Sequence, residues 1–240
     1  MYLKLYLIRK IKAIFLKLNL HVIFLPLNGI LLNLAYLSQL SKWRKEIPKL
    51  PFDDFFNSKV IYENRFNLHN HIFESENLDN EINYIEFGVA DGGSIKWWSQ
   101  KNTNPNSNFV GFDTFTGPPE DFGVLKIKDF DKKGVVPQFE DQRVSFEIGL
   151  FQDTLPAFAE NFDFSRKTIL HMDADLYTST LFVLTTLAFK LKKGDIIIFD
   201  EFGVPTHEFK AFKEFFSSYT FDYEVIGAIN NYLQLGIKIK

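Results

Sequence analysis

Short apolar runs alternate with helix-like stretches through most of the chain after residue 51. Five of these runs are rich in apolar residues, and we interpret them as strands that are buried on both faces. They predict strands at 84–89, 109–112, 144–148, 168–172 and 195–199, with helices at 57–76, 93–100, 155–162, 179–191 and 208–219. Strands and helices in alternation are typical of a parallel sheet that is covered by helices on both faces.

The C-terminal residues break this pattern. Tyr223–Ile229 and Tyr232–Ile239 read as two strands joined by Asn230 and Asn231, which predicts an antiparallel hairpin with a two-residue turn. We therefore expect an α/β fold, with a doubly wound, mostly parallel seven-stranded sheet that ends in an antiparallel β-hairpin. A helical segment at 1–50 is expected to precede this single domain at 51–240.

The first fifty residues are apolar and basic. Residues 1–18 predict an amphipathic helix, because apolar side chains recur at three- and four-residue spacing. Residues 18–41 carry no formal charge, but their longest apolar run, Val22–Leu27, is far shorter than the roughly 18 residues that a membrane span needs. Pro26 and the pair Asn28-Gly29 predict a break between two helices. Three interpretations stay open: docking on the body or on a second subunit of a homo-oligomer, peripheral membrane attachment, and a membrane span or cleaved signal.

Charge is divided unequally between the two parts of the chain. The first fifty residues hold nine Lys and Arg and one acid, whereas residues 51–240 hold 18 bases and 29 acids, a net charge of −11. Such a body should repel nucleic acid, because affinity for phosphate backbones comes mainly from Lys and Arg. The N-terminal segment suits an anionic lipid surface better. We therefore expect a cytoplasmic protein, with peripheral attachment to the inner face of a membrane as one interpretation.

Cysteine is absent from the sequence. Its absence excludes disulfides, thiolate metal sites and cysteine nucleophiles. Any metal or catalytic chemistry must therefore use carboxylates, histidines or hydroxyls. In a doubly wound sheet such groups are expected at the carboxyl ends of the strands, where ligands bind.

The first predicted strand ends in a glycine-containing turn, Glu86–Ser94. Gly88 allows a tight turn, and Gly92 lets a ligand approach the backbone closely. The helix that follows, with Ser94 near its start, favours an anionic group such as a carboxylate. The spacing G-x-x-x-G is neither the dinucleotide fingerprint nor a P-loop. A purely structural role for these small residues stays open.

The next two strand ends carry candidate nucleoside contacts. Asp113 is placed to accept hydrogen bonds from ribose hydroxyls, although it could also be a solvated loop acid. Phe151 could pack on a base and Gln152 could bind its edge. In the alternative interpretation of this turn, Asp153 or Thr154 caps the following helix.

Acidic residues gather at the fourth and fifth strand ends. Asp173 and Asp175 follow one strand, and Asp200 and Glu201 follow the next. These carboxylates would repel one another unless a positive group lies among them, and a hard divalent cation with oxygen ligands satisfies that need. Alternatively, one carboxyl has a raised pKa and acts as a base. In the plainer interpretation Asp175 caps a helix and Glu201 faces water.

These blocks together resemble the macrocin O-methyltransferase family of class I S-adenosylmethionine-dependent methyltransferases. The resemblance covers about residues 55–225 and rests on Glu86–Ser94 with Trp97-Trp98, Gly111–Phe115 with Gly117–Glu120, Gly149–Pro156, Asp173–Thr180 and Asp200–Phe202. It implies a Rossmann-like methyltransferase fold, S-adenosylmethionine as cofactor and a magnesium ion. Carried over, Glu86, Gly88 and Gly92 would line the methionine part, Asp113 would hold the ribose, Phe151 and Gln152 would lie near adenine, and Asp173, Asp200 and Glu201 would hold the metal. Glu201 departs from the second aspartate that is common in the family.

The resemblance implies methyl transfer to a hydroxyl of a sugar or glycan-like acceptor. A metal at Asp173, Asp200 and Glu201 would lower the pKa of that hydroxyl. Asp173 or His207, just past the fifth strand, could then take the proton, although the sequence favours a surface or capping histidine at 207. Two rival functions stay open: a metal-dependent glycosyltransferase that uses Asp173-Ala174-Asp175 as a D-x-D motif, and a non-catalytic nucleoside-binding module.

Overall fold

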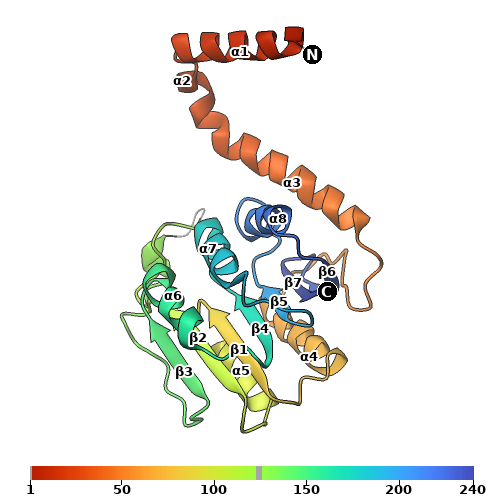
Figure 1. Ribbon diagram of the computed structural model, residues 1–240, viewed down its shortest axis with the longest axis vertical. Coiled ribbons are helices and arrows are strands. Elements are labelled where there is room, and N and C mark those ends of the chain that lie inside the picture. Colours follow the sequence, from red (N-terminus) through yellow and green to blue (C-terminus); the bar gives the residue numbers. More distant parts are fainter. Residues whose placement is uncertain (1, 123–125) are drawn as a thin grey trace.

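The computed structural model describes residues 2–122 and 126–240. Seven strands form one sheet in the order β3-β2-β1-β4-β5-β7-β6 (Figure 1). The strands are β1 (Ile82–Phe87), β2 (Asn108–Asp113), β3 (Val144–Ile148), β4 (Lys167–Met172), β5 (Ile196–Phe199), β6 (Tyr223–Ile229) and β7 (Gln234–Ile239). The first five pair in parallel, and β7 pairs antiparallel with both β5 and β6. The expected mostly parallel sheet with an antiparallel end is confirmed.

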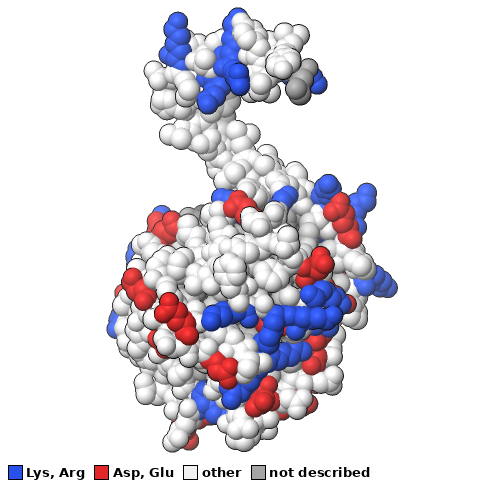
Figure 2. All heavy atoms as spheres, in the orientation of Figure 1, with Lys and Arg blue, Asp and Glu red and all other residues white. Residues whose placement is uncertain are grey.

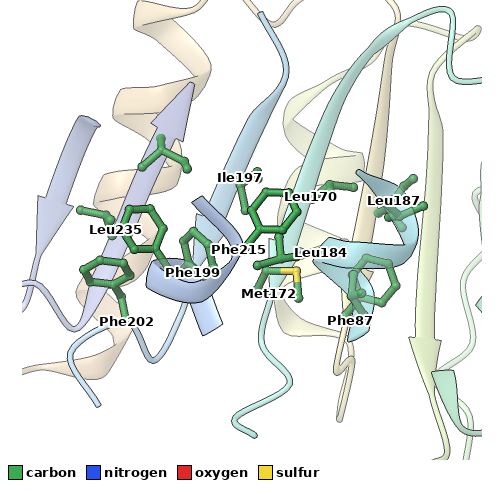
Figure 3. Packing of buried hydrophobic residues seen from close by; sticks show 14 of the residues in the cluster. Phe87, Leu170, Met172, Leu184, Leu187, Ile197, Phe199, Phe202, Phe215 and Leu235 are labelled. Atoms are coloured by element: carbon green, nitrogen blue, oxygen red, sulfur yellow. The ribbon is translucent and has the colours of Figure 1, made fainter. Parts of the chain in front are cut away.

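Helices cover both faces of the sheet. On one face lie α6 (Phe151–Asn161), α7 (Tyr177–Leu187) and α8 (Glu208–Ser218), and on the other lie α4 (Arg65–Ser75) and α5 (Gly93–Lys101) (Figure 1). Phe87, Leu170, Met172 and Phe199 project from the strands into the first layer, where Phe215 of α8 meets them (Figure 3). Strands that are buried on both faces explain why their sequences are continuous apolar runs. The exception is β3, an edge strand that is only partly buried.

Two local expectations are wrong for one shared reason. The helix expected at 57–76 begins only at Arg65, after the 3-10 turn η2 (Tyr62–Asn64), and the expected two-residue hairpin turn contains four residues, 230–233. Asn230, Asn231 and Tyr232 adopt left-handed backbone conformations, which asparagine tolerates well. The Asn230 and Asn231 side chains accept hydrogen bonds from the backbone N–H groups of Ile61 and Asn57, at 3.2 and 2.8 Å. These contacts hold the preceding segment in an extended conformation.

The N-terminal segment forms helices that extend away from the body (Figure 1). They are α1 (Tyr2–Lys17), α2 (His21–Phe24), the 3-10 turn η1 (Leu25–Leu27) and α3 (Asn28–Glu46). The sharp break lies at Asn19, whose φ is 51°, and not at Pro26 or Gly29 as expected. Pro26 occupies the first turn of η1, where no intrahelical N–H donor is needed, so the chain stays helical from His21 to Glu46.

The continuous helix His21–Glu46 keeps the interpretation as a membrane span open. Its 26 residues include a window of mean hydropathy 1.5, so by length and composition it could cross a membrane, although the apolar run within it is short. Only its C-terminal part meets the body. Trp43 packs against Phe202, Phe209 and Phe212, and its indole N–H donates to the Tyr223 hydroxyl at 2.9 Å. The end of α3 is thereby joined to the domain at 51–240.

Candidate active site

A cavity of about 430 Å³ opens at the carboxyl ends of the parallel strands. The chain leaves β1 toward β2 on one side and β4 leads to β5 on the other, so the adjacent ends of β1 and β4 diverge and leave a crevice. Eight of the predicted site residues line it: Glu86, Gly88, Ser94, Asp113, Phe151, Gln152, Asp173 and Glu201. Among the described residues, Gly92, Asp200 and His207 are not part of its wall.

Gly88 directly follows β1 and lies against the backbone of Asp173, which directly follows β4. Its φ is 94°, and a Cβ added there would lie 1.9 Å from the backbone carbonyl oxygen of Asp173. The N–H of Asp173 donates to the Phe87 carbonyl at 2.9 Å, which fixes this approach. Only glycine fits here, because both the backbone conformation and the space exclude a side chain.

Asp113 shapes the glycine loop in addition to lining the cavity. One carboxylate oxygen accepts hydrogen bonds from the backbone N–H groups of Val89 and Ala90, at 2.7 and 2.9 Å. The other oxygen accepts from the N–H of Phe115 at 2.7 Å. The interpretation of Asp113 as a merely solvated loop acid is therefore wrong. A ribose hydroxyl would share these oxygens with the loop.

The structure explains the glycine at position 92 by backbone conformation and crowding within the protein, whereas the sequence predicted close approach of a ligand. Gly92 is the residue before α5, in the left-handed conformation with φ 77°. A Cβ there would lie 3.2 Å from the side chains of Pro137 and Phe139, so the crowding comes from the protein's own loop. By contrast, Gly93 has open space on this test. The free space beside a ligand therefore lies at the start of α5 and not at Gly92.

The wall between β1 and α5 contains two buried polar groups. The Ser94 hydroxyl oxygen is buried and has no hydrogen-bond partner within the part of the chain described. The Glu86 carboxylate is also buried, and it accepts a hydrogen bond from the Tyr84 hydroxyl at 2.9 Å. Burial raises the pKa of Glu86 to about 8. Both groups are ready to bind a polar ligand, and a cationic ligand would restore the charge of Glu86.

The opposite wall comes from the start of α6. The Phe151 ring packs edge-on against Phe87 at a centroid distance of 5.4 Å, and Gln152 is exposed at the rim. The residue before this helix is Leu150, and no side chain caps the helix there. The capping alternative for Asp153 and Thr154 is therefore wrong, because both lie inside the first turn.

The acidic cluster already contains a positive group. Arg65, the first residue of α4, places one terminal nitrogen 3.1 Å from a carboxylate oxygen of Asp200 and 3.3 Å from one of Asp173. The same Asp200 oxygen accepts a hydrogen bond from the Tyr62 hydroxyl. Asp200 is fully buried, but His171, Arg65 and Tyr62 outweigh that burial and hold its pKa at about 2. Burial raises the pKa of Asp173 well above its usual value.

The remaining two acids, Asp175 and Glu201, line the cavity. Burial raises the pKa of Asp175 to about 7 and that of Glu201 to about 8, and the charge of Asp200 adds to both shifts. Asp175 adopts a left-handed backbone, and the residue that precedes α7 is Leu176, so the capping interpretation of Asp175 is wrong.

His207 stands apart from these acids. It is the residue before α8, and its ring lies edge-on against Phe122 at a centroid distance of 4.8 Å. Phe122 lines the cavity, so His207 lies behind the wall. Burial lowers the pKa of His207, which keeps the ring neutral at pH 7.

Arg65 and Tyr62 are cavity residues beside the acidic cluster that the sequence interpretation missed. The signal that could have found Arg65 is the charge argument itself, since four acids at neighbouring strand ends need a cation. Only Lys59 and Arg65 are basic between residues 51 and 80, the segment that leads into the first strand. Their proximity to the acids depends on how α4 packs, which no local pattern reveals.

The chain is similar to known O-methyltransferases in sequence. Residues 124–229 match the sequence model of the macrocin-O-methyltransferase (TylF) family. Mycinamicin III 3''-O-methyltransferase from Micromonospora griseorubida is 32% identical over 88 residues, which are 35% of this chain and 32% of that protein. The match thus spans about a third of the curated relative. The resemblance to the macrocin O-methyltransferase family is confirmed for the C-terminal half. The sequence blocks before residue 124 lie outside the matched residues.

Solved structures show the same fold over most of the chain. The calicheamicin methyltransferase CalS11 superimposes with a TM-score of 0.57 at 20% identity, covering 85% of this chain and 91% of its own. The O-methyltransferase NovP gives a TM-score of 0.57 at 19% identity, covering 88% of this chain and 98% of its own. The Rossmann-like methyltransferase fold is therefore confirmed.

Proposed function

We propose that this relative of the macrocin O-methyltransferases transfers the methyl group of S-adenosylmethionine to a hydroxyl of a sugar or glycan-like small molecule. The observation that carries the proposal is the cavity at the β1–β4 crevice, where the glycine loop, Asp113 and the acidic strand ends face one space. The confirmed family resemblance and fold support it. Neither rival function accounts for this combination as simply.

The residues present fit the cofactor. Bound S-adenosylmethionine supplies an activated methyl group on a sulfonium. Its ammonium group would find the buried Glu86 carboxylate, and its polar atoms would satisfy the unpartnered Ser94 hydroxyl. Asp113 would hold the ribose while it keeps the loop at Val89 and Ala90 in place. Phe151 and Gln152 would lie near adenine.

The acceptor would approach the acidic side of the cavity. The rim there is formed by Asp173, Asp175 and Glu201, whose carboxyl oxygens can accept hydrogen bonds from several sugar hydroxyls. One similar structure, with a TM-score of 0.52, is that of a TDP-rhamnose 3'-O-methyltransferase, and the mycinamicin enzyme is named for a 3''-hydroxyl. A sugar hydroxyl is therefore the proposed acceptor class.

The magnesium site expected at Asp173, Asp200 and Glu201 does not fit these residues as they are arranged. Arg65 is paired with both aspartates, and Asp200 lies outside the cavity wall. Among the described residues, the one group of three candidate ligands within 4.8 Å of one another is His69, His171 and Asp200, which is fully buried. We therefore derive no step through a metal.

The guanidinium of Arg65 supplies the positive charge that the acidic cluster requires. It keeps Asp200 ionised and orients Asp173 at the cavity wall. The hydroxyl of the sugar then gives its proton to a carboxylate on the rim of the cavity. Asp173 is the proposed base, and Glu201 is its neighbour on the rim. His207 remains a prediction only, and its place behind Phe122 makes direct contact with an acceptor difficult.

Calorimetric titration tests the choice between the functions. The protein should bind S-adenosylmethionine and its demethylated product when no sugar nucleotide is present. Asp113→Ala should weaken cofactor binding by roughly 1.5–3 kcal/mol, because hydrogen bonds to a charged group are lost. Asp153→Ala, a change in the first turn of α6 on the same side of the sheet, is the matched control and should bind normally. Binding of the sugar nucleotide alone would favour the glycosyltransferase and contradict the proposal.

A further inference from the structure

The N-terminal arm, defined as residues 2–35, is exposed along almost its whole length in the part of the chain that the structure describes. All of its residues are exposed except Phe15 and Leu20, which are partly covered. The helix meets the body only from Tyr36 onward, where the Tyr36 hydroxyl donates to Glu214 of α8 at 3.1 Å. Figure 1 shows α1 and the first turns of α3 standing clear of the sheet and its helices.

The arm exposes large apolar side chains on several sides of one helix. Ile30, Leu31 and Leu32 are 63%, 51% and 46% exposed. Successive residues of an α-helix point about 100° apart, so these three directions span more than half of the circumference. A protein partner covers one face of a helix, which would require a single apolar stripe. Lipid can surround a helix, and it therefore accounts for apolar exposure on several sides.

Charge on the arm fits an anionic lipid surface. No acid occurs before Glu46. Five basic residues lie on α1, and they are Lys4, Arg9, Lys10, Lys12 and Lys17. Residues 18–41 then carry no formal charge. Figure 2 shows this as blue atoms on α1, separated from the body by a white neck. Cationic side chains beside apolar ones bind anionic headgroups, each basic residue contributing about 1 kcal/mol near the surface.

The length of the uncharged segment agrees with the same partner. Residues 18–35, the uncharged residues that precede the docked Tyr36, would extend about 27 Å as a helix, compared with about 30 Å for the hydrocarbon core of a bilayer. The turn at Asn19 separates this segment from α1, so the two helices can take different directions. One can lie along the headgroups while the other enters the acyl chains.

We propose that the arm inserts into an anionic lipid bilayer, with α1 among the headgroups and the uncharged segment that follows it in the acyl region. The docked end of α3 then holds the body beside the membrane surface. This role is independent of the proposed methyl transfer, because it uses neither the cavity nor the residues around it.

Vesicle flotation with the full-length protein tests this proposal. Vesicles of phosphatidylcholine with one quarter phosphatidylglycerol are compared with pure phosphatidylcholine at low salt. The wild-type protein should float with the anionic vesicles and at least tenfold less with the neutral ones. A variant with Ile30→Ser, Leu31→Ser and Leu32→Ser should lose at least nine-tenths of the floated fraction. Lys10→Glu with Lys12→Glu should bind weakly and lose the preference for anionic lipid.

Matched controls lie on the body. Phe189, which is 90% exposed, supplies Phe189→Ser, and the exposed Lys133 supplies Lys133→Glu. Both should float like wild type. The arm variants should keep the wild-type circular dichroism and melting temperature, because the arm makes no contact with the core. The assay contains no cofactor and no acceptor, so its failure is separate from a failure of methyl transfer.

Two results would overturn the proposal. One is a wild-type protein that stays at the bottom of the gradient with anionic vesicles at low salt. The other is equal flotation of wild type and the triple serine variant. A dimer in solution that the serine variant converts to a monomer, without vesicle binding by either, would assign the arm to a second copy of the chain instead.

Discussion

Arg65 is the residue on which the chemistry of the acidic cluster depends. Sequence reasoning required a positive group among the strand-end acids and expected a divalent cation. The structure supplies a guanidinium from α4, within 3.1–3.3 Å of Asp200 and Asp173. The structure thus supplies a positive group of the kind that the charge argument required, whereas the magnesium ion stays a prediction. A fixed guanidinium can orient a carboxylate, but it cannot bind a hydroxyl as a metal does.

Replacing Arg65 with methionine should have two measurable effects. The fully buried Asp200 would lose its partner, which costs roughly 3–5 kcal/mol of unfolding free energy. Because the folded-state pKa of Asp200 is held at about 2, below its usual value, this stabilisation is present at neutral pH and is lost as the pH falls toward 2. Urea unfolding should therefore show that the difference in unfolding free energy between variant and wild type becomes smaller below about pH 4.

The same variant should expose two unpaired aspartates to cations. Manganese titration followed by electron paramagnetic resonance should detect a bound ion in Arg65→Met and none in wild type. Arg65→Lys, which keeps the charge, is the control and should behave like wild type. Tight manganese binding by the wild-type protein would contradict the interpretation of Arg65 as the resident cation.

Glu86 makes a prediction about pH. Its pKa rises to about 8 in the folded protein, whereas the unfolded chain loses this proton near pH 4.5. The folded state therefore holds the extra proton between these values, and Glu86 lowers stability as the pH rises through this window. The unfolding free energy therefore has a slope against pH, and Glu86→Gln should reduce that slope by up to about 1.4 kcal/mol per pH unit. Urea unfolding at several pH values from 5 to 8 measures it, and an unchanged slope would mean that Glu86 is already ionised.

At the scale of elements, the sheet and its order of helices follow from the sequence, while the turns do not. Apolar runs locate β1, β2, β4 and β5 because these strands lie in the sheet interior. The edge strand β3 was located as well, and the ends of all five are correct within two residues. The predictions of the hairpin turn and of the start of α4 were wrong because Asn230 and Asn231 form hydrogen bonds with a segment about 170 residues away in the sequence. Such pairing is invisible to any local rule.

Two glycines after β1 should respond differently to substitution, because Gly88 is crowded by backbone atoms and Gly93 is not. Gly88→Ala should destabilise the protein by about 3 kcal/mol or more, since its Cβ would overlap the Asp173 backbone at the β1–β4 junction. Gly93→Ala, five residues further on, has open space and a helical position, so it should be neutral or stabilising by up to about 1 kcal/mol. Chemical denaturation measures both. Similar losses for the two variants would show that the crowding at Gly88 is relieved by movement.

At the scale of the whole molecule, the chain consists of a body with a Rossmann-like methyltransferase fold and an arm that it holds by one helix end. Sequence patterns identified both parts, but they placed the helix break at Pro26 and Gly29, and it occurs at Asn19. They also could not locate the docking point. That point depends on Trp43 meeting aromatic rings from α8, which lies at the other end of the chain.

Trp43→Ala should therefore weaken the body and not only the arm. The indole packs against three phenylalanines and bonds to Tyr223, so its removal should cost about 3–5 kcal/mol of unfolding free energy. Deleting residues 2–35 should leave both this stability and cofactor affinity unchanged, because that part makes no such contact. Thermal unfolding of the two variants provides the comparison. A deletion as damaging as Trp43→Ala would show that the arm is part of the fold.

Methyl transfer itself is tested most directly by the mass of a product. Wild-type protein is incubated with S-adenosylmethionine, a panel of nucleoside diphosphate sugars and an excess of chelator, and the sugars are analysed by mass spectrometry. The account predicts that one of them gains the mass of a methylene group and that the demethylated cofactor appears in equal amount, in chelator as well as without it. Cofactor binding with no methylated product from any sugar would contradict the central claim, and product formed only when metal is restored would contradict the role given to Arg65.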